Sequence, residues 1–273
     1  MMLEKYFCML FFGLFFLTTS NLPAATIYVP DNYKTIEEAV KNASSNDTII
    51  VHEGHYTENV VITKSITIES TKGPEVSIIH ASVQDEPVIK ISNVNEVAIT
   101  GFTVTGSLFA GIYIHNSNNG QFYNNKSENN GSGIVLISSN NNRLVNNTAN
   151  SNEQYGIYLA LSIGNTLEEN TVSSNKDKGI FLSSSSHNNL INNKVNLNAW
   201  DGILLWSSPN NILKGNNVFR NRYGIVLSDS DSNTLTNNST WSNIYIILPI
   251  VLIYIGIIVY LIQKNLLLLL FKD

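Results

Sequence analysis

Acidic and basic side chains stand in the bends just before three repeated glycines, where such residues could act on a sugar. These residues are Asp177, Asp201 and Arg222. Two carboxylates facing one glycosidic bond could hydrolyse it, and carboxylates that hold Ca²⁺ beside a basic residue could take a proton from a sugar. Lysines flank Asp177 on both sides, however, so ordinary solvated bend charges explain the same residues. The three residues are therefore candidates only for an enzymatic alternative, and Ca²⁺ is expected only if that enzyme is a lyase.

His52 and His55 have a spacing that could place two imidazoles on one metal ion. Such a short motif is common by chance. The sulfur ligands that Cu(I) prefers are confined to one end of the chain, because its only cysteine and its three methionines lie within the first nine residues. We therefore expect no metal and no other cofactor.

Aromatic residues recur two positions after repeated glycines and in the bends beside them, where they form the best candidate binding surface. Both neighbours of this position in the strand carry apolar residues that face inward, so the position itself faces outward. A solvent-facing apolar strip usually binds a ligand or a partner, and aromatic faces suit sugar rings. The alternative is a column that stacks on itself and only supports the sheet. The candidate ligand-binding residues are Tyr113, Tyr155, Tyr158, Phe181, Trp200, Trp206 and Tyr223.

All of these aromatic candidates lie in a repeat of 22 or 23 residues, which determines the architecture. Each unit begins with a glycine, followed by Ile and, two positions later, by Leu or Ile. The apolar residues alternate with period two over short stretches, which indicates strands and excludes a helical repeat. Self-similarity at a fixed period indicates stacked units. The six glycines are Gly111, Gly133, Gly156, Gly179, Gly202 and Gly224.

Asparagine fills three further columns of the repeat, in the bends between the short strands. Three strands and three bends close one flat coil, and successive coils stack at the ordinary strand spacing of about 4.7–4.9 Å. Stacked asparagines can then donate an amide N–H to the carbonyl of the next coil. We therefore predict an all-β fold, a single-stranded right-handed parallel β-helix of about nine coils. The second asparagine column contains Asn125, Asn147, Asn170, Asn193, Asn216 and Asn238.

The N-terminal part of the repeat region keeps the same rhythm without the asparagines. We expect irregular coils over 26–110 and asparagine-ladder repeats over 111–243, so that the β-helix domain covers 26–243. Thr35 and Glu38 form a capping-box signature, and the apolar residues that follow make one helical face. A short helix there is expected to cover the open N-terminal end of the stack.

The two ends of the chain predict a membrane-anchored protein. Residues 1–25 combine Lys5 with an apolar run that is too short to span a membrane, as in a secretory signal peptide. Residues 244–262 contain no charge and are long enough to cross the hydrocarbon core as a helix. Lysines after this span place a short tail, 263–273, in the cytoplasm. We expect a single-pass protein of the cell membrane whose β-helix is extracellular or periplasmic.

The repeat resembles that of the NosD-like parallel β-helix proteins, a group that shares carbohydrate-binding and sugar-hydrolase repeats. Within 27–68, the segments Asp47–Val51, Gly54–Tyr56 and Lys64–Ile68 resemble the N-terminal coils of those proteins and of pectin esterases and lyases. The resemblance covers 27–243 and is specific for fold, not for activity. The group that the chain resembles includes surface proteins of archaea and bacteria, a periplasmic copper-maturation protein, and polysaccharide lyases and epimerases. It therefore implies the fold and leaves binding and enzymatic functions both open.

The charge of the chain adds one exclusion. A net charge of −5 with 16 basic residues argues against nucleic acid as a partner.

Taken together, the repeat, the aromatic strip and the two chain ends predict a membrane-anchored extracytoplasmic surface protein, without catalytic activity. We expect it to bind a glycan or another component of the cell envelope through its aromatic strip. Its partners would be the membrane and either a polysaccharide or a cell-envelope protein. The alternative is a polysaccharide-active lyase, hydrolase or epimerase.

Overall fold

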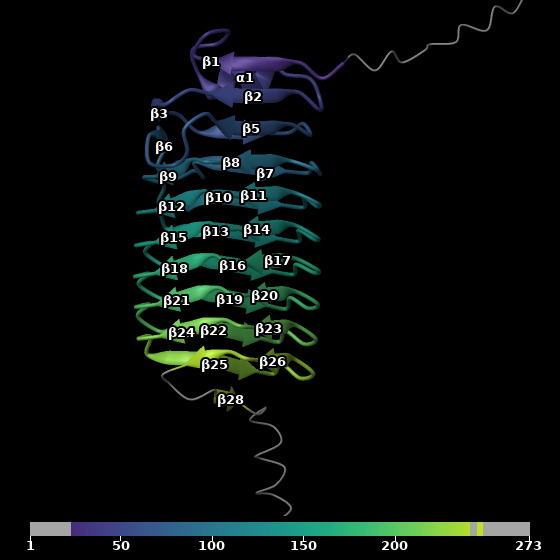
Figure 1. Cartoon of the computed structure of the whole chain (residues 1–273), viewed down its shortest axis with the longest axis vertical. Helices are drawn as coiled ribbons and strands as arrows, with labels where there is room; N and C mark the ends of the chain where they lie inside the picture. Colours follow the sequence, from purple (N-terminus) through teal and green to yellow (C-terminus); the bar gives the residue numbers. More distant parts are fainter. Residues whose placement is uncertain (1–22, 241–244, 248–273) are drawn as a thin grey trace, which may run out of the picture.

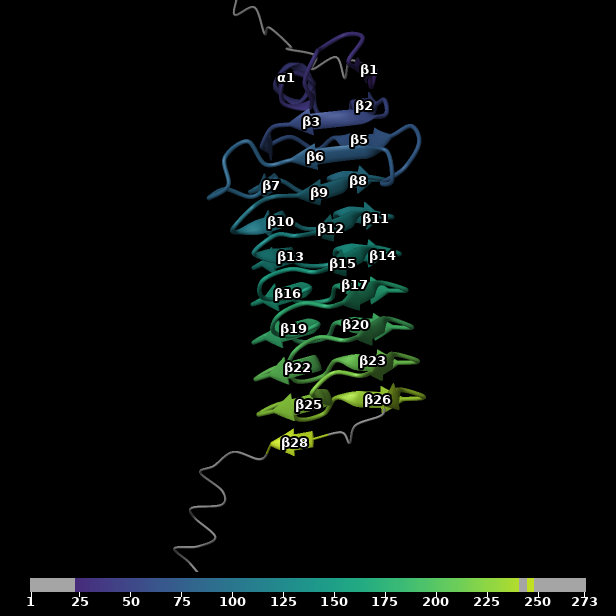
Figure 2. The ribbon, with the colours of Figure 1, turned by 90° about the vertical axis from the view of Figure 1, so that its left-hand side faces the viewer.

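The computed structural model describes residues 23–240 and 245–247 of the 273-residue chain. Over these residues the chain winds as one continuous coil, and each strand lies beside its equivalents in the coils before and after it (Figures 1 and 2). The strands form three parallel sheets of ten, nine and nine strands. The all-β, stacked-coil architecture of about nine turns predicted from the repeat is confirmed.

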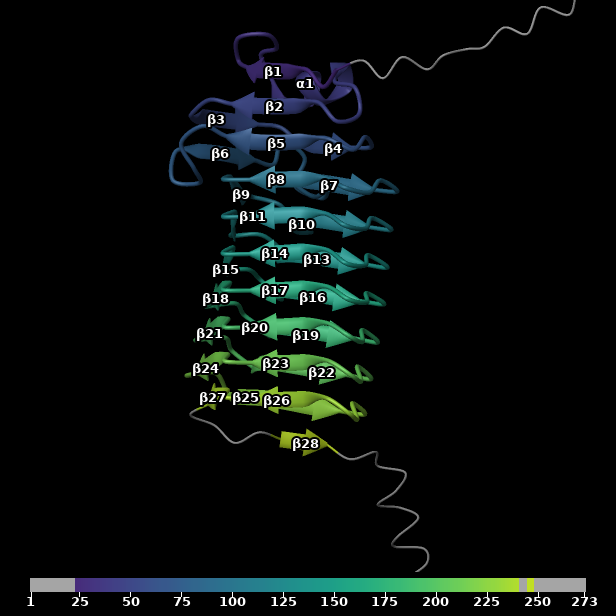
Figure 3. The same cartoon turned by 45° about the vertical axis from the view of Figure 1, so that its right-hand side comes forward.

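Each sheet is one column of equivalent strands, and sheets 1 and 2 lie side by side along the stack (Figure 3). Sheet 1 contains β1 (Thr26–Val29), β2 (Thr48–Val51), β5 (Thr67–Ser70), β8 (Ala98–Thr100), β11 (Gln121–Tyr123), β14 (Arg143–Val145), β17 (Thr166–Glu168), β20 (Asn189–Ile191), β23 (Ile212–Lys214) and β26 (Thr234–Thr236). Sheet 2 contains β4 (Val60–Ile62), β7 (Ile89–Ser92), β10 (Ala110–His115), β13 (Ser132–Ile137), β16 (Ile157–Ala160), β19 (Ile180–Ser183), β22 (Asp201–Trp206), β25 (Tyr223–Ser228) and β28 (Tyr245–Ile247). Sheet 3 contains β3 (Gly54–Thr57), β6 (Ser77–His80), β9 (Thr103–Thr105), β12 (Lys126–Glu128), β15 (Thr148–Asn150), β18 (Thr171–Ser173), β21 (Lys194–Asn196), β24 (Asn217–Phe219) and β27 (Ser239–Thr240).

The period-two alternation of the strands places a column of apolar side chains inside the coil. In sheet 2, Ile134 pairs with Ile157 and Leu136 pairs with Leu159, and all four side chains are fully buried. The same register continues from coil to coil, so like residues stack on like residues. The interior is therefore one continuous apolar core along the stack.

The asparagine columns form ladders inside the bends, as predicted. The Asn147 amide donates to Asn170 Oδ1 at 3.1 Å, and the Asn170 amide donates to Asn193 Oδ1 at 3.0 Å. The Asn170 amide also donates to the Leu144 carbonyl of the preceding coil at 2.9 Å. Its Oδ1 accepts in addition from the backbone N–H of Asn147 at 2.9 Å. One buried asparagine therefore joins three successive coils.

The serine column of the repeat forms a fourth ladder, which the sequence pattern alone did not reveal. The backbone N–H of Ser139 donates to Ser162 Oγ at 3.1 Å, and that of Ser162 donates to Ser185 Oγ at 3.1 Å. The Ser162 hydroxyl in turn donates to the Ala160 carbonyl at 2.8 Å. Serine thus satisfies a buried backbone donor in each coil, as asparagine does elsewhere.

The repeated glycines are required by space and not by backbone conformation. The φ angles of Gly133, Gly156 and Gly179 are not positive. A Cβ on Gly156 would lie 2.2 Å from Val172 Cγ1 and 2.9 Å from the Gly179 carbonyl oxygen. The column therefore holds glycine because sheet 3 and the next coil approach the backbone too closely for a side chain.

Left-handed backbone occurs elsewhere in the coils, at a few other glycines and at many non-glycine residues, most of them asparagine and serine. These short polar residues tolerate this region better than larger ones do. Leu161 is an exception, with a φ of 51° and a side chain that is 60% exposed. Its apolar side chain therefore gains little burial to offset the strain of its backbone.

Replacing Leu161 with Asn is expected to raise the free energy of unfolding by about 1 kcal/mol, because the left-handed conformation costs roughly 1–2 kcal/mol in an ordinary residue. The gain would appear as a higher midpoint of thermal or denaturant unfolding. Ile163→Asn is the matched control, since Ile163 is also exposed and its φ is not positive. That control should change stability by no more than about 0.5 kcal/mol. Equal effects of the two substitutions would contradict the strain argument.

A short helix, α1 (Ile36–Asn42), lies beside β1 at the N-terminal end of the stack (Figure 1). Thr35 Oγ1 accepts a hydrogen bond from the backbone N–H of Glu38 at 3.1 Å, as the capping-box signature predicts. The Glu58 carboxylate accepts two more, at 3.0 and 2.7 Å, from the first two N–H groups of the helix. The unpaired donors of the helix N-terminus are thereby satisfied from the coil beneath it.

The C-terminal boundary differs from the prediction. Tyr245–Ile247 form β28, which pairs in parallel with β25 and places Ile246 opposite Leu227. The membrane span was predicted to begin at residue 244. Its described part, Tyr245–Ile247, is instead one more strand of sheet 2, because its apolar residues continue the register of the repeat. No helix in the described residues is long and apolar enough to cross a membrane. The rest of that predicted span, the predicted tail and residues 1–22 of the predicted signal peptide lie outside the described residues.

Candidate functional site

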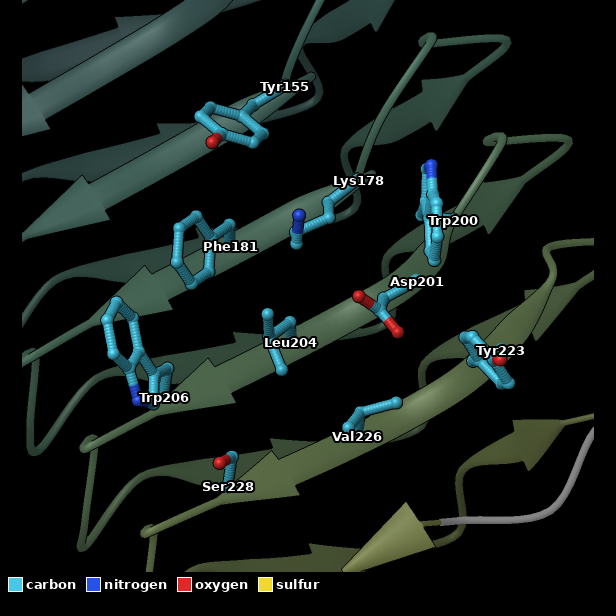
Figure 4. Close-up of a pocket in the computed structure, with 10 residues that line it drawn as sticks. All are labelled: Tyr155, Lys178, Phe181, Trp200, Asp201, Leu204, Trp206, Tyr223, Val226 and Ser228. Carbon is cyan, nitrogen blue, oxygen red and sulfur yellow. The ribbon is translucent and has the colours of Figure 1, made fainter. Parts of the chain in front are cut away.

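A groove on the outer face of sheet 2 gathers most of the predicted aromatic strip (Figure 4). It has a volume of about 810 Å³ and crosses four successive coils. Each coil contributes residues from the bend before its strand, from the outward positions of the strand, or from both. The lining residues are Tyr155, Lys178, Phe181, Trp200, Asp201, Leu204, Trp206, Tyr223, Val226 and Ser228. We call this surface the aromatic groove.

The floor of the aromatic groove is the outward column of sheet 2. Phe181 pairs with Leu204, and Leu204 pairs with Val226. The neighbours of Leu204 in the strand, Ile203 and Leu205, are fully buried in the core. The pleat of the strand therefore directs Leu204 outward, and the floor is apolar because the whole column is.

Trp206 forms one wall of the groove because its column neighbours are small. It pairs with Ser183 on one side and with Ser228 on the other. With no large side chain directly above or below it, the indole stands clear of the sheet and is 52% exposed. This difference in size hollows the surface beside Trp206, where Figure 4 shows Ser228 below the ring.

Trp200 stands on the opposite side of the groove, in the bend before β22 (Figure 4). It is 45% exposed. The Arg222 guanidinium lies 4.2 Å from the centroid of the Trp200 ring and 5.6 Å from that of Tyr223. A cation over an aromatic face attracts it electrostatically. Arg222 therefore supports this wall of the groove, and this contact accounts for a residue that was a catalytic candidate.

The upper end of the groove is aromatic packing within the strip itself. Tyr158 stacks on Phe181 with ring centroids 5.0 Å apart and planes 15° from parallel. Tyr155 lies 5.1 Å from Tyr158 and 5.4 Å from Phe181. At this end of the strip the aromatic residues therefore pack on one another, as the alternative of a column that only supports the sheet predicts. Trp200 and Trp206, toward the C-terminal coils, have exposed faces instead.

Two charged groups lie in the middle of the groove. Lys178 Nζ pairs with Asp177 Oδ1 at 2.8 Å and sits 5.4 and 5.5 Å from the ring centroids of Tyr155 and Phe181. Asp201 is only 8% exposed. Burial raises the pKa of the Asp201 carboxyl, and the charge of Asp177 raises it further, while Lys178 and a backbone hydrogen bond act to lower it. Of the three catalytic candidates, only Asp201 lines the groove.

The other sequence candidates lie elsewhere. Tyr113 packs against Phe109 at 5.2 Å and against His115 at 6.1 Å, two coils before Tyr158. His52 stacks near a tyrosine ring and lies 3.4 Å from the Asp31 carboxylate, and His55 is exposed. Across the described residues, no three side chains of His, Cys, Asp or Glu come together to hold a metal ion.

Sequence reasoning missed the role of Lys178 and Ser228 in the groove. Both were visible only as parts of columns, Lys178 in the bend before a repeated glycine and Ser228 four positions after one. The useful signal was the contrast between Trp206 and its nearest neighbours in the second of these columns, Ser183 and Ser228. A large outward residue between two small ones predicts a wall beside a hollow in the surface.

The stacked parallel coils place this chain in the class of β-helix proteins, and the aromatic groove lies on one outer face of the stack. The chain belongs to the family described as the right-handed β-helix region, whose model matches residues 18–162 and 87–240. This match also settles the handedness that the repeat predicted.

Among curated proteins, the chain is similar to a cell surface glycoprotein of Methanothermus fervidus. The two are 35% identical over 99 residues, which cover 36% of this chain and 16% of that protein. The likeness therefore joins part of this chain to a small part of a much longer protein.

Solved structures show the same fold in enzymes that act on polysaccharides. Pectate lyase Pel9A is 15% identical with a TM-score of 0.61, over 82% of each chain. The pectin methylesterase of Yersinia enterocolitica is 11% identical with a TM-score of 0.59, over 76% of this chain and 90% of that one. The A-module of the mannuronan C-5 epimerase AlgE6 of Azotobacter vinelandii is 13% identical with a TM-score of 0.56, over 74% of this chain and 69% of that one. At these identities the likeness shows the fold alone.

Proposed function

We propose that this chain is a cell-surface β-helix protein, of the NosD-like type, that binds a glycan in the aromatic groove without transforming it. The observation that carries the proposal is the pair of exposed tryptophans, Trp200 and Trp206, on either side of an apolar floor. Aromatic faces bury large apolar area at low entropic cost, and sugar rings present matching apolar faces. The partial likeness to a cell surface glycoprotein supports the location.

The proposed placement on the cell surface includes a membrane anchor. The apolar residues 248–262 follow β28 directly in the sequence, and lysines come after them. We propose that this segment, extended by the apolar residues 266–271, anchors the protein with its C-terminus in the cytoplasm. The groove, on the last four coils before β28, would then lie close to the membrane surface. The other end of the stack, which α1 would cover, would point away from the membrane.

The alternative function is a polysaccharide-active enzyme, and one observation favours it. Asp201 lies in the groove with a raised pKa, which is a property of catalytic acids. Its potential partners are already engaged, because Asp177 pairs with Lys178 and Arg222 lies on Trp200. Two carboxylates beside a lysine also make a poor donor set for Ca²⁺, which takes six to eight oxygen ligands. Binding therefore explains the arrangement with fewer additional assumptions.

Replacing Trp206 with Ala is expected to weaken glycan binding about tenfold, because one aromatic stacking surface is lost. A glycan array probed with the full chain would identify ligands, and titration of wild type and variant would measure the loss. Phe109→Ala is the matched control, since Phe109 is an exposed aromatic residue outside the groove. Equal affinity of the Trp206 variant and wild type would reject the groove as the binding site. Formation of unsaturated or shortened sugars in the same samples would instead support the enzyme.

A further inference from the structure

The aromatic groove contains one buried carboxylate, Asp201, that forms no ion pair with the described part of the chain. Asp201 is 8% exposed, and no other side chain in the described part of the chain donates a hydrogen bond to its carboxylate or lies within ion-pair distance of it. Burying a charge is costly unless it is paired. Figure 4 shows the Asp201 carboxylate between Lys178, Trp200 and Leu204, toward the middle of the groove. A charge in this position calls for a partner from outside the chain.

The cations around Asp201 already have other partners. Lys178 Nζ is 2.8 Å from Asp177 Oδ1, so the charges of these two residues balance each other. Arg222 is exposed to solvent and lies on the Trp200 ring. Among the charged groups described in and beside the groove, Asp201 is therefore the buried one without an ion-pair partner.

The rings of the groove already hold cations of this chain on their faces. Lys178 sits 5.4 Å from the Tyr155 ring centroid, and Arg222 sits 4.2 Å from that of Trp200. Aromatic walls around a carboxylate are the surroundings that recognise organic ammonium groups. Trp206, at the other side of the floor, has no ring or cation contact among the described residues. The groove thus offers an unoccupied aromatic face and an unpaired negative charge together.

We propose that the glycan bound in the aromatic groove carries free amino groups, and that Asp201 holds one of these ammonium groups while the sugar rings stack on Trp206 and Trp200. This inference rests on the proposed function and names its ligand class. Four coils at about 4.7–4.9 Å per step give the groove a length of roughly 14 Å. That length suits an oligosaccharide segment and not a single sugar.

The same geometry ranks the other classes of glycan. A neutral sugar could give its hydroxyl hydrogen bonds to Asp201 but could not neutralise the charge, so it should bind more weakly. An acidic sugar would place a second negative charge beside Asp201 and should bind least. The expected order is therefore amino sugar, then neutral sugar, then uronic acid.

The experiment compares three oligosaccharides of equal length on the full chain in detergent micelles: glucosamine oligomers, their N-acetylated forms, and galacturonate oligomers. Titration calorimetry at neutral pH should give at least tenfold tighter binding for the glucosamine oligomers than for the N-acetylated forms. The Asp201→Asn variant should lose about tenfold in affinity for glucosamine oligomers and keep its affinity for N-acetylated ones. Asp229→Asn removes the same charge from an exposed bend residue and should leave the preference unchanged.

The pH dependence of the wild type provides a second test that needs no variant. The ionisable groups that face Asp201 are Asp177, Lys178, Tyr155 and Tyr223. Because burial raises the pKa of Asp201, its negative charge is lost at a higher pH than that of an ordinary aspartate. The preference for glucosamine oligomers should therefore decline as the pH falls through that range, while binding of the N-acetylated forms stays constant.

The outcomes separate the two proposals. Equal affinity for glucosamine and N-acetylglucosamine oligomers would overturn the amino-sugar inference and leave the glycan-binding function standing. A preference that survives Asp201→Asn and does not change with pH would also overturn it, since general attraction to the net negative chain would then explain the result. Failure of all three oligosaccharides to bind would count against both proposals. Tightest binding of galacturonate would reverse the predicted order and reject the role of Asp201.

Discussion

An Asn170→Ala variant is expected to lose at least about 3 kcal/mol of stability, because one side chain serves several buried groups at once. Its Oδ1 accepts from the Asn147 backbone N–H at 2.9 Å and from the Asn147 amide at 3.1 Å. Its own amide donates to the Leu144 carbonyl at 2.9 Å. The variant removes all three hydrogen bonds at once, and a buried polar group left without a partner costs about 1–3 kcal/mol.

The loss should be visible as a lower midpoint of thermal unfolding. For a chain of this size, 1 kcal/mol corresponds to roughly 2–4 °C, so the expected shift is about 6–12 °C. Asn189→Thr is the matched control, since Asn189 lies in a strand of sheet 1 at the position where Thr166 stands one coil earlier. That change should move the free energy of unfolding by no more than about 0.5 kcal/mol. A loss below 1 kcal/mol for Asn170→Ala would mean that water enters the ladder and replaces the missing amide.

Much of the fold could be predicted from the sequence, because residues at the same position of successive repeats lie beside each other in the stack. Residues in one column pair with each other, so the Ile and Leu columns predicted the core and the asparagine columns predicted the ladders. The reason for the glycine column was not visible, since it depends on how closely sheet 3 approaches sheet 2. The C-terminal boundary was also missed, because the apolar residues of β28 fit both a strand register and a membrane span.

The candidate site was less predictable than the fold, because exposure depends on several columns at once. The outward position of Phe181 followed from the period, yet its ring is largely covered by Tyr155 and Tyr158. Trp206 is exposed because the residues paired with it are serines. Whether a bend carboxylate such as Asp201 is buried or solvated is decided by the neighbouring bends, which sequence spacing does not specify.

The repeated glycines give the second large effect, because a methyl group has no room at their positions. A Cβ on Gly179 would lie 2.4 Å from Val195 Cγ1, 2.6 Å from the Gly202 carbonyl oxygen and 2.7 Å from Asn198 Nδ2. Overpacking a well-filled interior usually costs about 1–3 kcal/mol. Two of these three neighbours, a strand carbonyl and a ladder amide, are fixed by the stack, so Gly179→Ala is expected to cost at least 3 kcal/mol.

A double variant tests which neighbour causes the loss. Val195→Ala removes the side chain nearest to the added methyl group, so in the Gly179→Ala background it should cost less than it does alone, and the two effects should not add. The carbonyl of Gly202 remains in place, so the double variant should stay well below wild type in its unfolding midpoint. Gly54→Ala is the control, because the nearest atom to a Cβ there would be in the Tyr56 ring, at an ordinary contact distance of 3.4 Å, and the φ of Gly54 is not positive. A Gly179→Ala protein as stable as the Gly54→Ala protein would show that adjacent coils can move apart, and that the glycine column is not needed to keep them close.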